Sequence, residues 1–593
     1  MKKFIIFIFA LVQCYTITNA QTFEWGLKSN STPKWRYADV NKNGSCYFSG
    51  IVQYGLGMDT ASFTGGSNYD AYVGMVNSTG SIQFLKKAIY DVAANENVIN
   101  NIAADNNDNF FLIFNVPDND VPIYVGDDTI QKDTATSRVL MAKYDENANL
   151  LWSKQYKPVN PTSNPTHEFL AANDERTPIA VDESGCVYVF VKFNGYVDAI
   201  IDTATLNWNG NYIFKFSPDG EMIYYKKITK LIPTVFNCDH QNNFLVAGTV
   251  TGSANPSLNT LDFGNNVVIN FPTTTANHFE FVLVKYDSNG VAQWAKVTNS
   301  NYPTAAINNV PTTVTYMSID NNNAIYLTGY FNTQIVFFDD TLNGVSTSYE
   351  RNNFMTKFKV NGDYQWAKSY VDTSSNQDGA EIRQLKFDSD NNLYLFCHYI
   401  QKGFSFYGNA MPKNSSSGSS DRMLAKLDTN FNLLWWKYLV GGESNNVLTK
   451  MNVSDASDIY IVGGGTSNTK VATLVLQSGY WMPAEDSTAV GTINGTPYVC
   501  KFSQGSIVNV ENSLYENMSN GIYPNPAQNK IYFTDAGEKI RCVEIFNING
   551  QIIYKENTTD ISNGIDISHF KTGVYFVKKY TEKKLSMHKF IKL

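Results

Sequence analysis

The sequence predicts an all-β protein that consists of a large repeat array and a small C-terminal β domain. The chain is rich in Tyr (36) and Phe (37), only 17% of its residues are charged, and Asn, Thr, Ser and Gly separate the apolar runs. That composition is typical of short strands joined by tight turns. In addition, one stretch, RVLMAKYDENANLLWSKQY from Arg138 to Tyr156, recurs in near copies along the chain.

The first 20 residues, MKKFIIFIFALVQCYTITNA, have the layout of a cleaved signal peptide. Two lysines precede an apolar run from Phe4 to Val12, and a small-residue site ends at Ala20. A lipoprotein box from Leu11 to Cys14 is the alternative, but Gln13 occupies a position where a small residue is expected. No later apolar stretch approaches the ~20 residues of a membrane helix. We therefore expect an exported mature chain that starts near Gln21 and has no transmembrane segment.

The second half of each repeat predicts a β-hairpin. The stretch at Arg138 is matched by FVLVKYDSNGVAQWAKVT from Phe281, FMTKFKVNGDYQWAKSY from Phe354 and MLAKLDTNFNLLWWKYL from Met423. A glycine often occupies the turn, where a positive φ angle is cheap for glycine and costly for other residues. These turn glycines are Gly80, Gly220, Gly290 and Gly362.

The first half of each repeat is an Asp/Asn turn followed by a strand, and a further short apolar run comes before the hairpin, as at 259–266 and 335–344. This organisation gives four strands per repeat. Seven four-stranded repeats predict a seven-bladed β-propeller over residues 21–508. The seven turns start at Asp39, Asp105, Asp182, Asp239, Asp320, Asp388 and Asp455.

The seventh repeat lacks its last strand. It runs through YVCKFSQG at 498–505, and no W-x-K segment follows. The segment TFEWGLKS at 22–29 carries Trp25 in the corresponding aromatic position. We therefore expect this N-terminal segment to complete the seventh blade and close the ring.

A lysine recurs two residues after the aromatic of the last strand. Residues two apart share a face of a strand, so the stem packs beside the aromatic ring while the amine reaches solvent. A ring of such lysines is one route to an anionic ligand, but a charge that protects an edge strand explains the repetition more simply. The lysines are Lys86, Lys154, Lys226, Lys296, Lys368 and Lys437.

The net charge of -8 leaves no broad basic surface, so nucleic acid is not an expected partner. Apart from Cys14, the cysteines stand singly inside apolar runs and form no CxxC motif. Export permits disulfides, but dispersed cysteines of this kind more often act as small buried hydrophobes. They are Cys46, Cys186, Cys238, Cys397, Cys500 and Cys542.

The repeat resembles the SBBP-type bacterial β-propeller repeat. The resemblance lies in the Asp/Asn turn, the strand ending near Gly and the A-K-Y-D-x-x-G-x-x-x-W-x-K hairpin. It implies a propeller and says little about activity, because such propellers serve mostly as surface or adhesion-like modules.

A linker is expected at 509–519, and residues 520–593 then read as a compact antiparallel sandwich with alternating apolar residues and N-G turns. This region is similar to the type A C-terminal sorting domain of the type IX secretion system of Bacteroidota. The resemblance implies passage through the outer membrane by that machinery, with the mature protein released or held at the cell surface. The matching motif residues are Tyr523, Pro524, Asn525, Pro526, Asn549, Gly550, Gly573, Tyr575 and Lys589.

No catalytic or cofactor-binding constellation is found. The six histidines share no spacing, and the chain has no HExxH, GxSxG or P-loop motif. Two turns resemble the start of a calcium loop, although Gly50 and Tyr399 stand where its acidic twelfth residue is expected. An Asx-type turn is the simpler interpretation. The weak calcium candidates are Asp39, Asn41, Asn43, Asp388, Asp390 and Asn392.

We therefore expect an exported binding or adhesion module that contacts a glycan or a surface protein through its irregular segments, for example 272–277, 343–352 and 413–420. One alternative is a polysaccharide lyase or hydrolase with an axial pocket lined by Asp, Tyr and Lys. Another is a structural surface protein without a dedicated ligand.

Overall fold

The computed structural model describes an all-β chain that divides into two compact units, one of residues 21–504 and one that contains the described residues after 504. Within the part described, no helix is long and apolar enough to cross a membrane. The described residues are 21–28, 34–58, 60–92, 99–115, 123–134, 137–159, 166–169, 178–194, 198–206, 210–229, 231–251, 259–270, 279–298, 313–331, 334–343, 352–369, 380–400, 405–406, 409–410, 420–439, 449–463, 472–478, 488–493, 498–504, 522–533, 540–547, 552–557, 564–581 and 585–593. The predicted signal peptide and linker lie outside these residues.

The larger unit repeats one antiparallel sheet, whose strands we call first to fourth from the centre outward. Repeat 1 has β2 (Lys34–Val40), β3 (Cys46–Met58), β4 (Ala61–Val76) and β5 (Ile82–Val92). Repeat 2 has β6 (Ile99–Ala104), β7 (Phe110–Phe114), β10 (Arg138–Tyr144) and β11 (Leu150–Pro158). In repeat 3, β12 (Thr166–Phe169) and β13 (Ile179–Val181) share the first place, followed by β14 (Val187–Asn194), β17 (Gly210–Phe216) and β18 (Met222–Ile228).

The same order continues in the next three repeats. Repeat 4 has β19 (Ile232–Cys238), β20 (Phe244–Thr251), β23 (Phe279–Tyr286) and β24 (Ala292–Val297). Repeat 5 has β25 (Thr313–Ile319), β26 (Ile325–Phe331), β29 (Asn352–Phe358) and β30 (Tyr364–Lys368). Repeat 6 has β31 (Ala380–Phe387), β32 (Leu393–Ile400), β35 (Ser420–Leu427) and β36 (Leu433–Leu439).

Repeat 7 takes its fourth strand from the N-terminus. Its own strands are β37 (Thr449–Val453), β38 (Ile459–Gly463) and β41 (Tyr498–Gln504), and β1 (Gln21–Lys28) pairs antiparallel with β41. The register joins Gln21 to Gln504 and Lys28 to Tyr498, with an irregularity between Phe23 and Trp25. The predicted pairing of the N-terminal segment with the seventh repeat is therefore confirmed.

One part of the strand assignment was wrong. We expected the short apolar run between the second strand and the hairpin to be a blade strand, but the sheet gains its fourth member from a strand before the Asp/Asn turn. The short runs instead form separate hairpins, two of which extend the outer edge of the preceding repeat. These hairpins are β8–β9 (Tyr124–Val125, Asp128–Thr129), β15–β16 (Ala199–Ile201, Ala204–Leu206), β21–β22 (Thr260–Asp262, Val268–Asn270), β27–β28 (Gln334–Phe337, Asp340–Asn343), β33–β34 (Ser405–Phe406, Asn409–Ala410) and β39–β40 (Ala472–Ser478, Thr488–Ile493).

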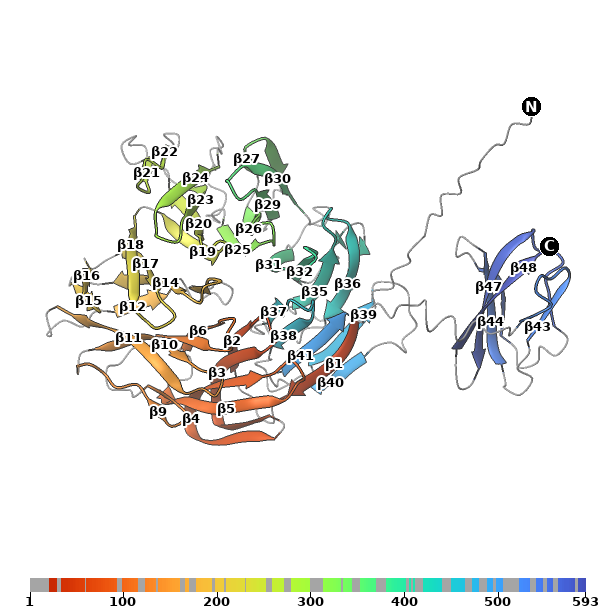
Figure 1. Cartoon of the computed structure of the whole chain (residues 1–593), viewed down its shortest axis with the longest axis horizontal. Coiled ribbons are helices and arrows are strands. Elements are labelled where there is room, and N and C mark those ends of the chain that lie inside the picture. The colour runs from red at the N-terminus through yellow and green to blue at the C-terminus, as the bar shows by residue number, and fades with distance from the viewer. Residues whose placement is uncertain are drawn as a thin grey trace, which may run out of the picture. The chain divides into compact units, whose positions relative to one another are not determined.

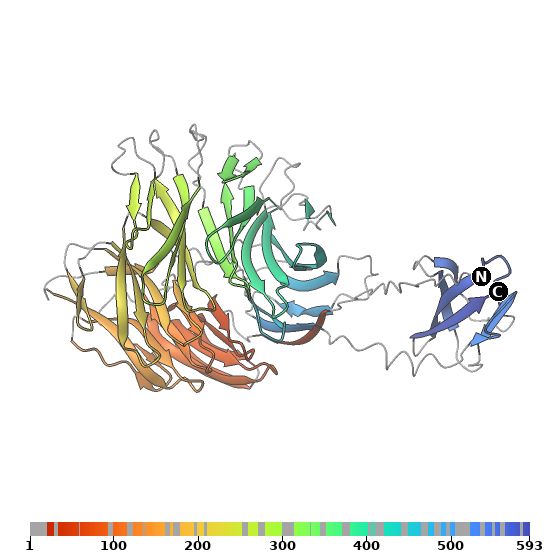
Figure 2. The same cartoon turned by 45° about the horizontal axis from the view of Figure 1, so that its top comes forward.

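The first strands contact one another in a cyclic order. Contacts run from β2 to β6, β13, β19, β25, β31 and β37, and β37 contacts β2 again. Figure 1 shows the sheets of the larger unit around a common centre, with the red end of the array beside its blue end. Figure 2 shows the same sheets from a second direction.

Buried Asp–Lys pairs join several repeats to the next one. The lysine of the K-Y-D strand reaches the aspartate of its own Asp/Asn turn, as Lys285 does to Asp239 at 2.7 Å. The same ammonium donates to a turn carbonyl of the following repeat, and Lys501 of repeat 7 donates in this way to Ser78 O of repeat 1 at 3.1 Å. The other described pairs with both side chains buried are Lys143–Asp105, Lys215–Asp182 and Lys426–Asp388.

The recurrent aromatic residue makes a second contact between repeats. Trp152 donates from Nε1 to Pro218 O at 2.9 Å, and its ring lies on Gly220, where a Cβ atom would meet it at 2.9 Å. Gly290 and Gly362 stand in the same way under Tyr224 and Trp294. The predicted positive φ angles at the turn glycines are confirmed, with values of 88, 87, 79 and 82° at Gly80, Gly220, Gly290 and Gly362.

The outer lysines lie on the fourth strands, as predicted. Lys86 donates to Asn147 O at 2.7 Å and Lys226 to Gly290 O at 3.1 Å, both on the turn of the next repeat. Lys154 pairs with Asp202 at 3.0 Å. These three amines therefore contact neighbouring parts of the scaffold. The interpretation of the cysteines as buried hydrophobes is confirmed for Cys46, Cys186, Cys397 and Cys500.

The C-terminal unit consists of two antiparallel sheets. One contains β42 (Ile522–Tyr523), β43 (Lys530–Phe533) and β46 (Ile565–Asp566), and the other has the order β45 (Ile552–Glu556), β44 (Ile540–Asn547), β47 (Gly573–Thr581) and β48 (Leu585–Lys592). Both sheets contribute to one core, which includes Ile531, Ile545 and Phe590.

Deletion of residues 21–30 should abolish the cooperative unfolding of the larger unit, because β41 then loses its outer partner and the ring loses its link to the N-terminus. Calorimetry or denaturant titration checks this. A shortened chain that unfolds with the same midpoint and cooperativity as the full chain would contradict it.

Replacing Lys426 with Met should destabilise the protein by about 3 kcal/mol or more, because Asp388 is left buried without its counter-ion. The side chains of this pair are 3% and 0% exposed. Lys154→Met, which breaks a more exposed pair, should cost less than about 1 kcal/mol. Equilibrium unfolding in urea measures both, and equal losses would show that burial does not decide the cost.

Candidate functional site in the central channel

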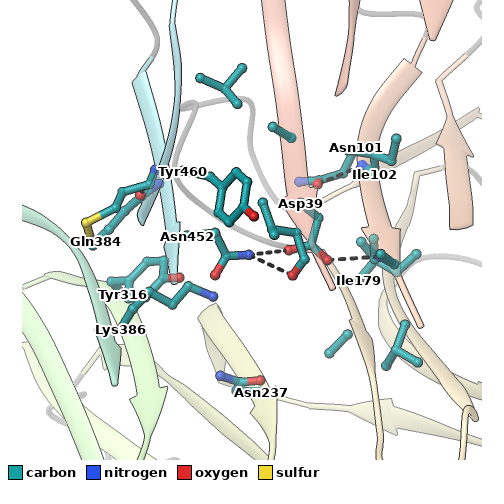
Figure 3. A pocket seen from close by; sticks show the side chains of 18 of the residues that line it. Asp39, Asn101, Ile102, Ile179, Asn237, Tyr316, Gln384, Lys386, Asn452 and Tyr460 are labelled. Atoms are coloured by element: carbon teal, nitrogen blue, oxygen red, sulfur yellow. Dashed lines mark hydrogen bonds between the residues drawn. The ribbon is translucent and has the colours of Figure 1, made fainter. Parts of the chain in front are cut away.

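A polar cavity of about 230 Å³ lies at the centre of the larger unit. All seven first strands contribute to its wall, with residues that precede the Asp/Asn turns by a few positions. The cavity therefore occupies the end of the channel that the turns surround. Figure 3 shows its side chains, which come from strands far apart in the sequence.

One position of the repeat supplies most of the channel chemistry. In each repeat the first turn residue donates its N–H to the carbonyl four residues later, and the residue two places before it lies on the first strand. In repeats 1 and 7 this first turn residue is Asn41 and Ser454, so the predicted turn starts at Asp39 and Asp455 were wrong. Six of the seven residues two places before the turn line the cavity, while repeat 5 contributes Tyr316 and Met317 instead of Ser318. The equivalent residues are Asp39, Ala103, Ala180, Asn237, Ser318, Lys386 and Asn452. The turns and hairpins are repeated, but the charge at this position is not.

Asp39 is fixed at the wall of repeats 1, 2 and 7. Its Oδ2 accepts the Ala104 N–H at 2.9 Å, and its Oδ1 accepts Asn452 Nδ2 at 2.9 Å. Asn452 Nδ2 also donates to Val40 O at 3.1 Å. These bonds hold a negative charge at the edge of the cavity.

Lys386 brings a positive charge to the opposite side of Asn452, as Figure 3 shows. Among the described residues, the groups that act on its charge are Tyr316 and Asp39. Burial acts to lower the pKa of Lys386, but attraction to Tyr316 and to Asp39 outweighs this effect and raises the pKa. The side chain is therefore an ammonium at neutral pH. Nearby, Gln384 Oε1 accepts the Met451 N–H at 2.5 Å.

A second charged cluster joins the turns of four repeats. Glu183 Oε2 accepts from Lys42 Nζ at 2.6 Å and from Asn106 Nδ2 at 3.2 Å, and Glu183 Oε1 lies 3.0 Å from His240 Nδ1. The hydrogen bond with His240 and the charge of Lys42 lower the pKa of Glu183 to about 2. The same hydrogen bond raises the pKa of His240.

The calcium candidates do not converge on one point. Asp39 lies in the channel, whereas Asn43 Nδ2 donates to Asp108 Oδ2 at 3.2 Å and Asn41 Oδ1 accepts the Ser45 N–H. In the other turn, Asp388 accepts the N–H groups of Asp390 and Asn392 and pairs with Lys426. Within the described residues, no group of three or more His, Cys, Asp or Glu could hold a metal ion.

The predicted sorting-motif residues come together where they are described. Asn525 Nδ2 donates to Lys589 O and Asn525 Oδ1 accepts the Ile591 N–H, both at 2.9 Å, so the Tyr523–Pro526 segment is held against β48. Tyr575, two residues after Gly573 on β47, stacks on Phe590 with ring centroids 5.5 Å apart. Tyr523–Pro524 and Asn525–Pro526 are cis peptide bonds. Asn549 and Gly550 lie outside the described residues.

Sequence reasoning missed the channel residues Tyr316, Lys386 and Asn452, because it did not recognise the first strands. An alignment of the residues two places before each turn would have shown a position whose charge and size vary between repeats. The contact segments expected at 272–277, 343–352 and 413–420 lie outside the described residues, apart from Asn343, Asn352 and Ser420.

The Glu183–His240 pair should make stability depend on pH. The raised pKa of His240 gives stability that is present below its ordinary value of 6.5 and is lost as pH rises through the raised value. The lowered pKa of Glu183 gives stability that is present above 4.5 and is lost as pH falls toward 2. The pair is partly exposed, so we expect less than about 1 kcal/mol.

Thermal melts should therefore show His240→Gln less stable than the parent at about pH 5.5, with the difference disappearing at about pH 9. In a Glu183→Gln background the same substitution should have no pH-dependent effect. A difference between parent and His240→Gln that is equal at both pH values would contradict this assignment.

Comparisons with known proteins bear mainly on the C-terminal unit. Among solved structures, a catalytically inactive virginiamycin B lyase from Staphylococcus aureus, solved with quinupristin, is 9% identical with a TM-score of 0.36, covering 80% of this chain and 98% of the lyase. A PL25 ulvan lyase is 11% identical with a TM-score of 0.27, covering 77% of this chain and 84% of the enzyme.

Among curated proteins, an uncharacterized WD repeat-containing protein of Acanthamoeba polyphaga mimivirus is 25% identical over 151 residues. The match covers 25% of this chain and only 10% of the viral protein. Residues 521–593 match the family described as the secretion system C-terminal sorting domain. The chain thus carries a type IX secretion sorting domain, which directs its export to the cell surface or the extracellular space.

Proposed function

We propose that this exported chain is a seven-bladed β-propeller, spanning about residues 21–508, that acts as a binding module and holds its ligand in the central channel. A linker at 509–519 joins it to the sorting domain at 520–593, which contacts the secretion machinery. The ligand is a glycan or a surface protein with a small polar group that enters the cavity.

The cyclic contact order of the first strands supports seven blades. The bond from Lys501 to Ser78 O repeats, between the last and first repeats, the bond that Lys143 makes to Pro218 O between the second and third. The strand β1 fills the one vacant place in the seventh sheet. Closure of the ring then leaves no long open sheet edge.

The variation at the channel position is the observation that carries the binding role. Repeated Asp, Lys and aromatic residues hold the blades together, whereas equivalent channel residues change from Asp39 to Lys386 and to the small Ala103 and Ala180. A pure scaffold has no need for two opposite charges in a cavity. Convergent polar groups in a preformed cavity are the usual composition of a small-ligand site.

A polysaccharide lyase or hydrolase is the second candidate, because Asp39, Tyr316 and Lys386 line one cavity. Against catalysis by Asp39 stand the two hydrogen bonds from Ala104 and Asn452 that occupy its carboxylate. Release of reducing ends or unsaturated products from a polysaccharide panel by the protein of residues 21–593 would favour the enzyme over the binding module.

The binding role can be tested on glycan and protein arrays with the chain of residues 21–593. We expect retention of a ligand by the parent and its loss in Ala180→Phe, because the added ring fills the channel. Val291→Phe, at a position 40% exposed, is the matched control and should bind like the parent. No retained ligand, or equal retention by Ala180→Phe, would contradict binding in the channel.

A further inference from the structure

We propose that the channel recognises an acidic sugar residue, with Lys386 as the group that binds its carboxylate. This inference rests on the proposed binding role of the channel. It adds the chemical class of the ligand and the direction in which the ligand lies.

Lys386 differs from the buried lysines of the K-Y-D strands in its partner. Lys143, Lys215, Lys285 and Lys426 each form an ion pair with a buried aspartate. Lys386 has Tyr316 beside it, and a phenol carries no full charge. Asp39 attracts Lys386 from the far side of Asn452, where its carboxylate already accepts from Ala104 and Asn452. An ammonium has three N–H donors, so donors remain for a ligand in the cavity that Lys386 lines. A ligand carboxylate supplies a negative charge in direct contact with the ammonium and acceptors for these donors.

The rest of the wall suits hydroxyl groups better than an apolar side chain. Asn237 and Gln384 add amides, which offer donors and acceptors together, and Tyr316 and Tyr460 add rings with hydroxyl groups. A sugar ring presents hydroxyls at its edge and C–H groups on its face, so both kinds of group find partners. The cavity of about 230 Å³ exceeds the roughly 150 Å³ that holds a benzene ring, and one substituted six-membered ring fits it.

Asp39 gives the site a direction. Its carboxylate is held on the far side of Asn452 from Lys386 and repels a second anion there. The ligand carboxylate therefore lies toward repeats 5 and 6, and its hydroxyls lie toward Asp39. The small side chains of Ala103 and Ala180 leave room for the ring beside repeats 2 and 3. A single terminal or branching residue fits this arrangement.

Saturation-transfer NMR with glucuronate and glucose tests the proposal on the chain of residues 21–593. Glucuronate should bind at least tenfold more tightly than glucose, and acetate should compete with it. Lys386→Gln should weaken glucuronate binding about tenfold or more, as expected for loss of a charge-assisted bond, and should weaken glucose binding less. Lys386→Arg should retain most of the affinity, and Lys154→Gln, at a fourth strand, should match the parent.

Equal binding of glucuronate and glucose, or unchanged glucuronate binding in a folded Lys386→Gln variant, would overturn the proposal. If Lys386→Gln fails to fold, competition by acetate on the parent protein decides. Displacement of glucuronate by acetate supports a carboxylate site, and a lack of displacement overturns the proposal. A ligand found on the arrays that is lost in Ala180→Phe but carries no acidic sugar would overturn the acidic-sugar assignment alone. The channel-binding role would then stand.

Discussion

The larger unit depends on the buried aspartate–lysine pairs of repeats 2, 3, 4 and 6. In repeats 2, 3 and 4 the lysine also donates to a carbonyl of the next repeat. Asp239 is locked by the N–H groups of its own turn, and Lys285 joins that carboxylate to a carbonyl of repeat 5. Burial of two charges is costly, so such a pair adds little net stability over a hydrophobic pair. What it supplies is geometry, because a misplaced neighbouring repeat leaves the buried ammonium without its carbonyl acceptor.

Residues that contact a neighbouring repeat recur along the chain, whereas residues that line the channel vary between repeats. The turns, the aromatic residue of the fourth strand and the turn glycine all touch a neighbouring repeat, as Trp152 touches Gly220. The residue two places before the turn touches the channel instead, and there Ala180 and Lys386 occupy equivalent places. A rigid frame with a variable lining lets one fold present a specific set of charges without altering its packing.

The hairpins and the N-terminal strand could be predicted from the sequence because both leave local marks. A glycine such as Gly290 indicates a turn with a positive φ angle. The W-x-K pattern indicates the fourth strand, and because no such pattern follows residue 504, the segment around Trp25 was predicted to take that place. The first strands have no such local sequence pattern. Segments such as INNIAA at 99–104 are buried on both faces or face a polar channel, so they show no alternation of apolar and polar residues. The short apolar runs were misassigned because a separate hairpin and a blade strand have the same local pattern. The role of Lys386 could not be predicted from its local sequence, because Lys386 and Asp39 come close only when the first strands assemble around the cavity.

Because β1 pairs with β41, the larger unit can complete its last sheet only when the chain extends to residue 504. Gln21 pairs with Gln504, which is the largest sequence separation among the described strand pairings. Bringing the two ends together costs about 5 kcal/mol of chain entropy beyond a constant. A chain that stops short of residue 504 keeps two unpaired sheet edges, which are sites for aggregation and for proteolysis. The sorting domain follows that closing strand in the sequence. A chain that includes the sorting domain therefore also includes β41, the strand with which β1 pairs.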